Sequence, residues 1–545
     1  MSKMPLISAV VACLMLSPVL VLAQGEPPSP AAMADEIRTA ATQPNDGENG
    51  RPLPLITHWT SGESELSKGF RLPTQLSLIE QGHYLLPWVT LPTEKTSADV
   101  LTPADFQRLA QLNLPFTMIS SQWEKRLTND PKYFELPPEQ NPNVVGVDGQ
   151  IMKKVSPFGP VEYWRKVGKS WTDTPRMKEL QRIYPDPPLV IFLSNNEHHK
   201  LRWTDVETSK RYLDLYGPGR DDAFKRKVVA DGWIERYRAL QEGMREGLVS
   251  PAWREKAIFA GYNAFGLEHM GRWGGWENYA LNTSERADPN PLMWDGGSPS
   301  YYTHNWNPST DYKTWSPQIE FMNDVFLLDE AYQLNPDFWL ELSIWDGYTS
   351  KSLRIPPEPN DKRQYYRNLG QSYTPERYAG FVQFGMWLLR PRAVREFRFW
   401  VDDWDRGEPY FLALADAVDR VHNNPTLRSW WQNSELVANR KHPHPYQTAV
   451  PSRFAGADRW FLLDADINPQ EFPWETFWEV KVFSLARVRG AAPNRQWLIY
   501  THSPLENRKN VTLTVPGYGD VVVDVEVGGS YYVVDEVSKT IKNVK

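Results

Sequence analysis

The sequence has almost no cysteine and no concentrated block of charge. Its single cysteine, Cys13, lies in an apolar N-terminal segment, so we expect neither disulfides nor a catalytic thiolate in the mature chain. The 60 basic and 67 acidic residues are spread along the chain and give a net charge of −7. This pattern disfavours a dedicated nucleic-acid-binding protein. Beyond the N-terminus, no apolar stretch is long enough to span a bilayer.

Patterns that bind metals or nucleotide cofactors are also scarce. The chain has only ten histidines, and no His-x-x-x-His spacing occurs near the residues considered below. No glycine-rich phosphate loop follows the first predicted strand, which disfavours a doubly wound dinucleotide-binding sheet. Arg390 and Arg392 are the only hint of a phosphate pocket for a nicotinamide-dependent barrel reductase. We therefore predict no metal and no cofactor.

Aromatic residues, in contrast, are abundant. The 24 Trp, 24 Tyr and 22 Phe make up 13% of the chain. Trp and Tyr offer a flat apolar face on which a sugar ring can pack and keep a polar edge for hydrogen bonding. Sugar binding and the filling of a large core both explain this composition.

The N-terminus predicts export. Lys3 is followed by an apolar run from Pro5 to Leu22 and a small-residue cleavage pattern ending at Ala23, as in a secretory signal peptide. The sequence around Cys13 loosely resembles a bacterial lipidation box and leaves lipid anchoring open as an alternative. We predict a signal peptide over 1–23, a linker or extension over 24–75, and a secreted or periplasmic protein.

The middle of the chain predicts a (β/α)₈ TIM barrel over 76–445. Short apolar runs alternate there with amphipathic helical patterns, which indicates βαβ units and a parallel sheet. The predicted helices include Pro103–Leu112, Val161–Arg182, Asp221–Glu246 and Gln318–Tyr332. The eight predicted strands are Tyr84–Leu91, Phe116–Ser121, Ile151–Ser156, Leu189–Ser194, Ala257–Gly261, Tyr301–Trp306, Phe338–Ile344 and Phe381–Trp387.

The last hundred residues, 446–545, change to period-two alternation with Gly, Pro and Asn between the runs. This pattern predicts a C-terminal antiparallel β-sandwich. Its predicted strands are Trp460–Leu463, Glu479–Leu485, Gln496–Thr501, Val511–Val515, Val521–Val527 and Ser530–Val534.

The predicted fourth strand ends abruptly in Asn195, Asn196 and Glu197. The carboxyl ends of barrel strands face the active site, so Glu197 would be presented there. Retaining glycoside hydrolysis needs two carboxyl groups about 5–5.5 Å apart, one to donate a proton and one to attack the anomeric carbon. Glu197 is the candidate proton donor. The alternative is a helix N-cap at Asn195 or Asn196 with an acidic first turn.

This arrangement resembles the clan of retaining (β/α)₈ glycosidases, clan GH-A, whose fourth strand ends in Asn-Glu and whose seventh ends in a second Glu. The resemblance covers roughly residues 80–390 and comes nearest to agarases and other galactan-degrading members. It implies that Glu197 is the acid/base and that Asn196 binds the hydroxyl next to the anomeric carbon.

The seventh predicted strand carries Glu341 among apolar neighbours, where a carboxylate should be functional or paired. Glu341 is the predicted nucleophile. Apolar residues continue to Ile344, so Glu341 could lie mid-strand, and Asp346 near the end of the run is the rival.

Aromatic and polar residues on other predicted strand ends would line the same cleft. By the clan resemblance, Trp387 at the end of the eighth strand would form the floor of the −1 subsite. Basic residues after Glu197 suit a charged polysaccharide, such as a sulfated algal galactan. The alternative function is a non-catalytic carbohydrate-binding barrel. The substrate-binding candidates are Asn196, His198, Trp123, Tyr262, Trp273, Trp276, Tyr302, His304, Trp306, Trp345 and Trp387.

Overall fold

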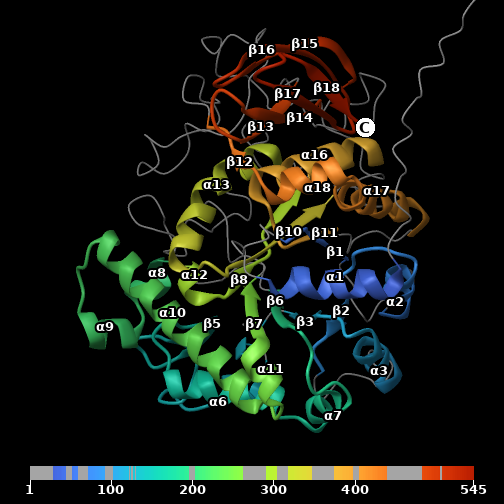
Figure 1. Cartoon of the computed structure of the whole chain (residues 1–545). Helices are drawn as coiled ribbons and strands as arrows, with labels where there is room; N and C mark the ends of the chain where they lie inside the picture. The colour runs from blue at the N-terminus through green and yellow to red at the C-terminus, as the bar shows by residue number, and fades with distance from the viewer. Residues whose placement is uncertain are drawn as a thin grey trace, which may run out of the picture.

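The computed structural model has a large α/β unit and a smaller C-terminal β unit (Figure 1). In the described part of the chain, no helix is both long and apolar enough to cross a membrane. The structure describes residues 29–43, 52–58, 72–92, 102–121, 123, 127–128, 130–195, 203–261, 290–302, 317–345, 374–396, 404–438, 482–503 and 506–545.

The α/β unit is built on a closed ring of parallel strands. The neighbours follow the order β1-β11-β10-β8-β7-β6-β3-β2, and β9 also pairs with β10. The strands are β1 (Leu55–His58), β2 (Trp88–Thr90), β3 (Phe116–Ser121), β6 (Val190–Asn195), β7 (Ala257–Gly261), β8 (Gly296–Gly297), β9 (Ser300–Tyr302), β10 (Trp339–Trp345) and β11 (Ala393–Glu396).

Backbone hydrogen bonds on Ile56 close this ring. Its amide donates to the Tyr84 carbonyl and its carbonyl accepts from the Leu86 amide, both at 2.7 Å, which joins β1 to the segment before β2. The ring thus has eight positions, the sixth of which is shared by β8 and β9. The predicted (β/α)₈ TIM barrel is confirmed.

Three sequence expectations about the strands were wrong. The expected linker 24–75 contains β1, the first barrel strand, as well as helix α1 (Pro30–Thr42). The expected third strand is β5 (Ile151–Val155), which pairs only with β4 (Asn143–Val145) in a hairpin outside the barrel. The expected eighth strand, Phe381–Trp387, is part of helix α16 (Pro375–Leu389). Because one strand was missed and one was added ahead of β6, β6 and β10 remain fourth and seventh in the ring.

Helices surround the ring, and their ends follow local signals. Thr102 forms a capping box with Asp105 ahead of α3, and Asp221 caps α10. The single helix expected over Val161–Arg182 is divided because Thr174 caps a new helix that begins at Pro175. The helices are α2 (Leu72–Glu80), α3 (Pro103–Leu112), α5 (Pro131–Phe134), α6 (Val161–Thr172), α7 (Pro175–Ile183), α8 (Trp203–Glu207), α9 (Lys210–Tyr216), α10 (Asp222–Gly247), α11 (Pro251–Lys256), α12 (Asn290–Met293), α13 (Pro317–Leu334), α17 (Trp404–Asn423) and α18 (Pro425–Gln432).

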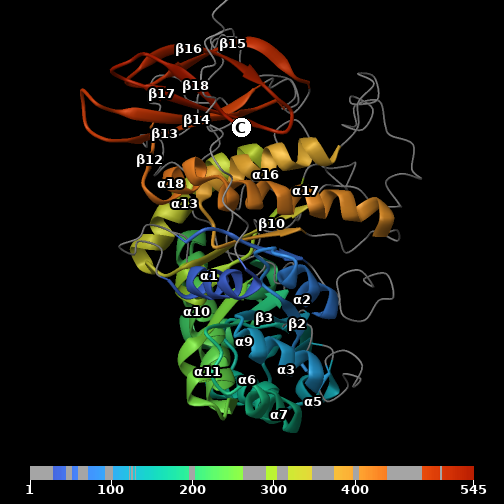
Figure 2. The ribbon, with the colours of Figure 1, turned by 45° about the vertical axis from the view of Figure 1, so that its right-hand side comes forward.

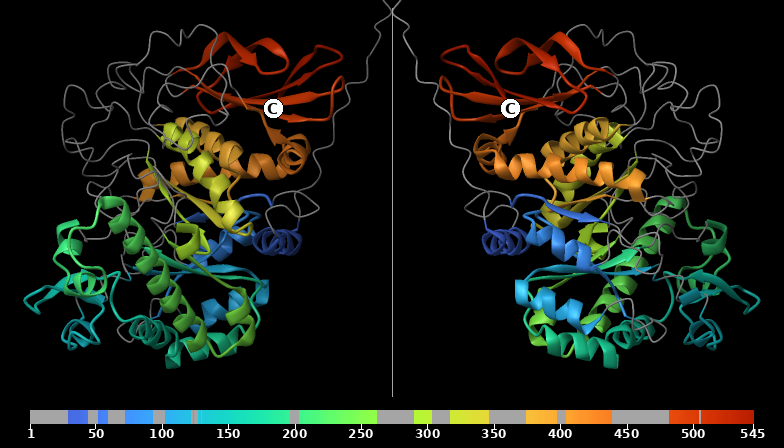
Figure 3. Two further views of the ribbon diagram at one scale, coloured as in Figure 1. Left: turned by 90° about the vertical axis from the view of Figure 1, so that its left-hand side faces the viewer. Right: turned by 90° about the vertical axis from the view of Figure 1, so that its right-hand side faces the viewer.

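Helices α6 and α10 approach each other unusually closely, at the side of the barrel away from the C-terminal sheets (Figure 3). A Cβ on Gly168 of α6 would lie 1.9 Å from the Leu240 carbonyl oxygen, and one on Gly243 of α10 would lie 1.9 Å from the Arg165 carbonyl oxygen. Only glycine allows the two backbones to come so close.

The C-terminal unit is the predicted antiparallel sandwich. A five-stranded sheet, β12-β13-β14-β17-β18, and the hairpin β15-β16 enclose a valine-rich core. The expected strand Trp460–Leu463 lies outside the described residues. The strands are β12 (Glu435–Leu436), β13 (Phe483–Arg489), β14 (Gln496–His502), β15 (Arg508–Val515), β16 (Gly519–Val525), β17 (Ser530–Asp535) and β18 (Ile541–Val544).

Helix α16 joins the sandwich to the barrel (Figure 2). The indole of Trp387 donates to the Tyr531 hydroxyl at 2.8 Å, and Arg487 donates to the Trp387 carbonyl at 2.9 Å. All three side chains are buried. This helix is therefore covered on both faces, which explains its strand-like apolar run.

Candidate active site

Most of the sequence candidates come after barrel strands in the sequence, but few of them are among the described residues. For Tyr302 and Trp345 the structure gives the backbone alone, and it pairs them across β9 and β10. The candidates outside the described residues are Asn196, Glu197, His198, Tyr262, Trp273, Trp276, His304, Trp306 and the rival nucleophile Asp346.

Glu341 lies inside the barrel and is held there by two neighbours. Its Oε1 is 3.1 Å from Nε of Arg395 on β11 and accepts a 2.8 Å hydrogen bond from the hydroxyl of Ser298, just after β8. Arg395 Nη2 in turn donates to the Ser298 oxygen at 2.7 Å. The exposed fractions are 2% for Glu341, 0% for Arg395 and 1% for Ser298. A carboxylate, a guanidinium and a hydroxyl thus form a closed triangle.

The strand register explains why these side chains meet. Glu341 lies beside Ala393, and Ser343 lies beside Arg395, in the parallel pair β10–β11. Side chains two apart on a strand share a face, so Glu341 and Ser343 project to the same side as Arg395. The guanidinium of Arg395 also lies 4.7 Å from the ring centre of Trp88 on β2, in a cation–π contact.

Three further hydroxyls belong to this interior face. In the strand register Thr57 of β1 lies beside Arg395, and Thr117 of β3 lies beside Trp88. The hydroxyls of Thr57, Thr117 and Ser343 are buried, and none has a hydrogen-bond partner among the described residues. Barrel interiors are usually filled by Val, Ile and Leu, so this belt of polar side chains is atypical.

Opposing electrostatic effects act on Glu341. Burial raises the pKa of this carboxyl above its ordinary value, while the charge of Arg395 and the hydrogen bond from Ser298 act to lower it. Loss of Arg395 would therefore favour the protonated form further.

The position of Glu341 along β10 agrees with the mid-strand placement left open by the sequence. It lies four positions before Trp345 at the end of the strand, which corresponds to roughly 13 Å at about 3.3 Å per residue. A substrate that reacts with Glu341 must therefore reach into the barrel.

Two predicted cleft residues have other positions. Trp387 is on α16 and packs against the sandwich, so the prediction that it ends the eighth strand as a subsite floor was wrong. Trp123 is 1% exposed and packs against Trp171 and Trp294, with ring centres 5.6 Å apart in both contacts. Trp123 therefore belongs to the core rather than to a groove wall.

Sequence reasoning missed Arg395, Ser298 and Trp88. The signal was present in Arg395-Glu396, a charged pair that directly follows the apolar Ala393-Val394. Arg395 could have been identified from this signal only if the eighth strand had been predicted at Ala393–Glu396. Among the described residues, no group of three His, Cys, Asp or Glu side chains is arranged to hold a metal ion.

No protein-family model and no curated protein matches this sequence. A GH36 α-galactosidase from Geobacillus stearothermophilus is similar in structure with a TM-score of 0.40 at 10% identity, covering 94% of this chain and 58% of that chain. Xylanase A of P. fluorescens subsp. cellulosa has a TM-score of 0.30 at 10% identity, and the match covers 67% of this chain and 97% of the xylanase. A sugar phosphate isomerase/epimerase from Parabacteroides distasonis has a TM-score of 0.28 at 11% identity, and the match covers 69% of this chain and 99% of the isomerase. The chain spans little more than half of the α-galactosidase, and the barrel assignment rests on the strand pairing.

Proposed function

We propose that the protein is a retaining glycoside hydrolase that acts on a polysaccharide, with Glu341 as nucleophile and Glu197 as acid/base. The observation that carries the proposal is the way Glu341 is held. Both described contacts, from Arg395 and Ser298, use Oε1, so neither engages Oε2. A nucleophile needs one oxygen fixed and the other directed at the anomeric carbon.

The unpartnered hydroxyls support a polar ligand inside the barrel. A buried polar group without a partner costs about 1–3 kcal/mol, and such groups are concentrated where function requires them. Thr57, Thr117 and Ser343 present three on the face that carries Glu341. The hydroxyl groups of a sugar could donate to and accept from each of them.

The proposed reaction has two displacements. Glu341 attacks the anomeric carbon while the glycosidic C–O bond breaks and the leaving oxygen takes the proton of Glu197. Water then attacks the glycosyl ester, gives its proton to Glu197 and releases the Glu341 carboxylate. Arg395 favours the ionised form of Glu341 that both steps need.

The substrate is proposed to be an extracellular polysaccharide, with sulfated galactans as the first class to test and secretion or periplasmic export as the location. The purified chain would be incubated with sulfated and neutral galactans, xylans, mannans and β-glucans, and the products separated by chromatography. We expect release of oligosaccharides from at least one polymer. Binding of a polymer without any hydrolysis would indicate a non-catalytic carbohydrate-binding barrel instead.

Three matched amide variants test the residue roles on an activated substrate. Glu341→Gln should abolish turnover. Glu197→Gln should be reactivated by azide, because azide attacks the intermediate without a general base. Asp346→Asn is the control and should keep activity. If Asp346→Asn is inactive and Glu341→Gln is active, the nucleophile is Asp346. Full activity of Glu197→Gln on polysaccharide contradicts the acid/base role, since proton donation contributes about 10²–10⁴-fold.

A further inference from the structure

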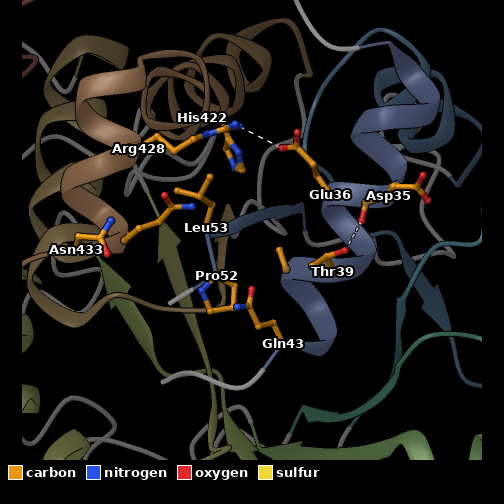
Figure 4. A pocket seen from close by; sticks show the side chains of 11 residues that line it. Asp35, Glu36, Thr39, Gln43, Pro52, Leu53, His422, Arg428 and Asn433 are labelled. Atoms are coloured by element: carbon orange, nitrogen blue, oxygen red, sulfur yellow. Dashed lines mark hydrogen bonds and ion pairs between the residues drawn. The ribbon is translucent and has the colours of Figure 1, made fainter. Parts of the chain in front are cut away.

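A cavity of about 560 Å³ lies toward the amino end of β1, and its lining does not include Glu341 or the partners of Glu341. Its walls come from α1, from Pro52 and Leu53 just before β1, and from α17 and α18 (Figure 4). Small-molecule sites commonly have volumes of about 300–1,000 Å³. The cavity is therefore large enough for a ligand of one or two sugar units.

One wall of the cavity holds a buried nitrogen with no hydrogen-bond partner among the described residues. His422 on α17 is 4% exposed, and its Nε2 is 3.1 Å from the Pro54 carbonyl oxygen. A carbonyl can only accept, so Nε2 carries the hydrogen and Nδ1 offers a lone pair. Nδ1 is buried and unpaired. Burial also lowers the pKa of His422 to about 3, which keeps the ring neutral.

The ring of His422 is held rigidly. It stacks on Tyr84, with ring centres 3.4 Å apart and planes 11° apart. The Tyr84 hydroxyl donates to Glu36 at 2.9 Å, and Arg428 of α18 pairs with the same carboxylate at 3.2 Å. The acceptor on His422 is thus placed in a preformed polar wall (Figure 4).

The charges around the cavity select against a strongly charged ligand. Glu36 is balanced by Arg428, and Asp35 is balanced by Arg38 at 2.7 Å. The remaining polar lining includes the side-chain amides of Gln43, Gln432 and Asn433, which both donate and accept. A neutral molecule with many hydroxyl groups matches this mixture.

We propose that this cavity is a second binding site that takes a neutral mono- or disaccharide. The site is separate from Glu341 and does not depend on the proposed catalytic function. A sugar hydroxyl donates to Nδ1 of His422, and other hydroxyls bond to the amides of Gln432 and Asn433. The bound ligand links α1 to α18.

The test is binding to the full chain, measured by titration calorimetry and saturation-transfer NMR. The probes are glucose, galactose, xylose, lactose and cellobiose, with inorganic phosphate and ethanolamine as the anionic and cationic comparisons. We expect saturable binding of at least one neutral sugar. The absence of saturable binding of any of them, or a preference for phosphate or ethanolamine, overturns the proposal.

Variants locate the binding. Gln432→Ala and Asn433→Ala remove lining amides, and each should weaken affinity about two- to tenfold for a lost hydrogen bond. Ala40→Leu should fill the cavity and weaken binding further. Thr42→Ala, on the same helix as Ala40 but outside the lining, is the matched control and should bind normally. Glu341→Gln should also bind normally. Unchanged affinity in the Gln432, Asn433 and Ala40 variants places the sugar elsewhere and refutes the assignment.

Discussion

The buried pair of Glu341 and Arg395 should be strongly coupled in stability. Its Nε–Oε1 distance is 3.1 Å and neither side chain is more than 2% exposed. At an effective dielectric constant of about 20, two charges at this distance attract by roughly 5 kcal/mol, and desolvation offsets much of that. Removal of one partner takes the opposite charge away from a group that stays buried, which typically costs about 3–5 kcal/mol.

The perturbation is a double-mutant cycle of Glu341→Leu, Arg395→Leu and both together. Each single variant should lose about 3–5 kcal/mol of unfolding free energy. The double variant should lose little more unfolding free energy than either single variant, because it removes both charges. This result corresponds to a coupling free energy between Glu341 and Arg395 of about 3 kcal/mol. Urea unfolding at neutral pH, followed by tryptophan fluorescence and circular dichroism, measures all four proteins.

The chain offers a matched control in the sandwich. Arg495 and Glu536 are closer, with Nη2 and Oε1 2.7 Å apart, but their side chains are 31% and 17% exposed. Solvent screens this pair, so its coupling should be much smaller despite the shorter distance. If the two cycles give equal coupling, or if the single variants at Glu341 and Arg395 barely change stability, then the burial argument is refuted.

Three other predictions follow from the described contacts. The raised pKa of Glu341 means that the folded protein holds this proton to higher pH than the unfolded chain, so the contribution of Glu341 to stability should be complete below pH 4.5 and be lost as pH rises toward the folded pKa. Urea unfolding across pH should show this slope in the wild type, and Glu341→Gln should flatten it. Trp387→Phe removes the bond to Tyr531 and should cost about 0.5–1.5 kcal/mol without changing catalytic turnover; a loss of turnover would restore Trp387 to the active site. Gly168→Ala places a methyl group against the Leu240 carbonyl and should lower the melting temperature, whereas an unchanged melting temperature would mean that α6 and α10 can separate freely.

The strands that could be predicted from the sequence are those with long apolar runs and polar ends. β6 and β10 have six and seven residues and are bounded by polar segments. An apolar run of that length is long enough to predict a strand. The carboxyl end of a barrel strand then indicates which residues approach an active site. Glu341 was proposed in this way, as an acid inside an apolar run, and its role stays a prediction.

The elements that could not be predicted are short or determined by distant partners. β1 and β11 have four residues each, too few to show a period. They are strands because each pairs with the other, across more than 300 positions of sequence. α16 shows the opposite problem, since a helix covered by barrel and sandwich is apolar all round and its sequence resembles a buried strand.

The site was only partly predictable for the same reason. Arg395 belongs to β11, so its contact with Glu341 depends on a strand that local sequence does not reveal. Ser298 is fixed by its amide, which donates to the Gly261 carbonyl at 2.9 Å at the end of β7. The partners of Glu341 therefore come from the neighbours of β10 in the ring, and no local pattern encodes which strands those are.

Ser343 separates the catalytic interpretation of the barrel interior from a purely structural one. It lies two residues beyond Glu341 on the same face, beside Arg395, and its buried hydroxyl has no partner among the described residues. If that hydroxyl serves only a ligand, Ser343→Ala should stabilise the free protein by up to about 1–3 kcal/mol, because an unpaired buried polar group is removed. The same change should lower kcat/KM on polysaccharide, as expected where stability is given up for function. A variant that is less stable and fully active would show instead that the hydroxyl supports the fold, and the polar belt would no longer favour a substrate site.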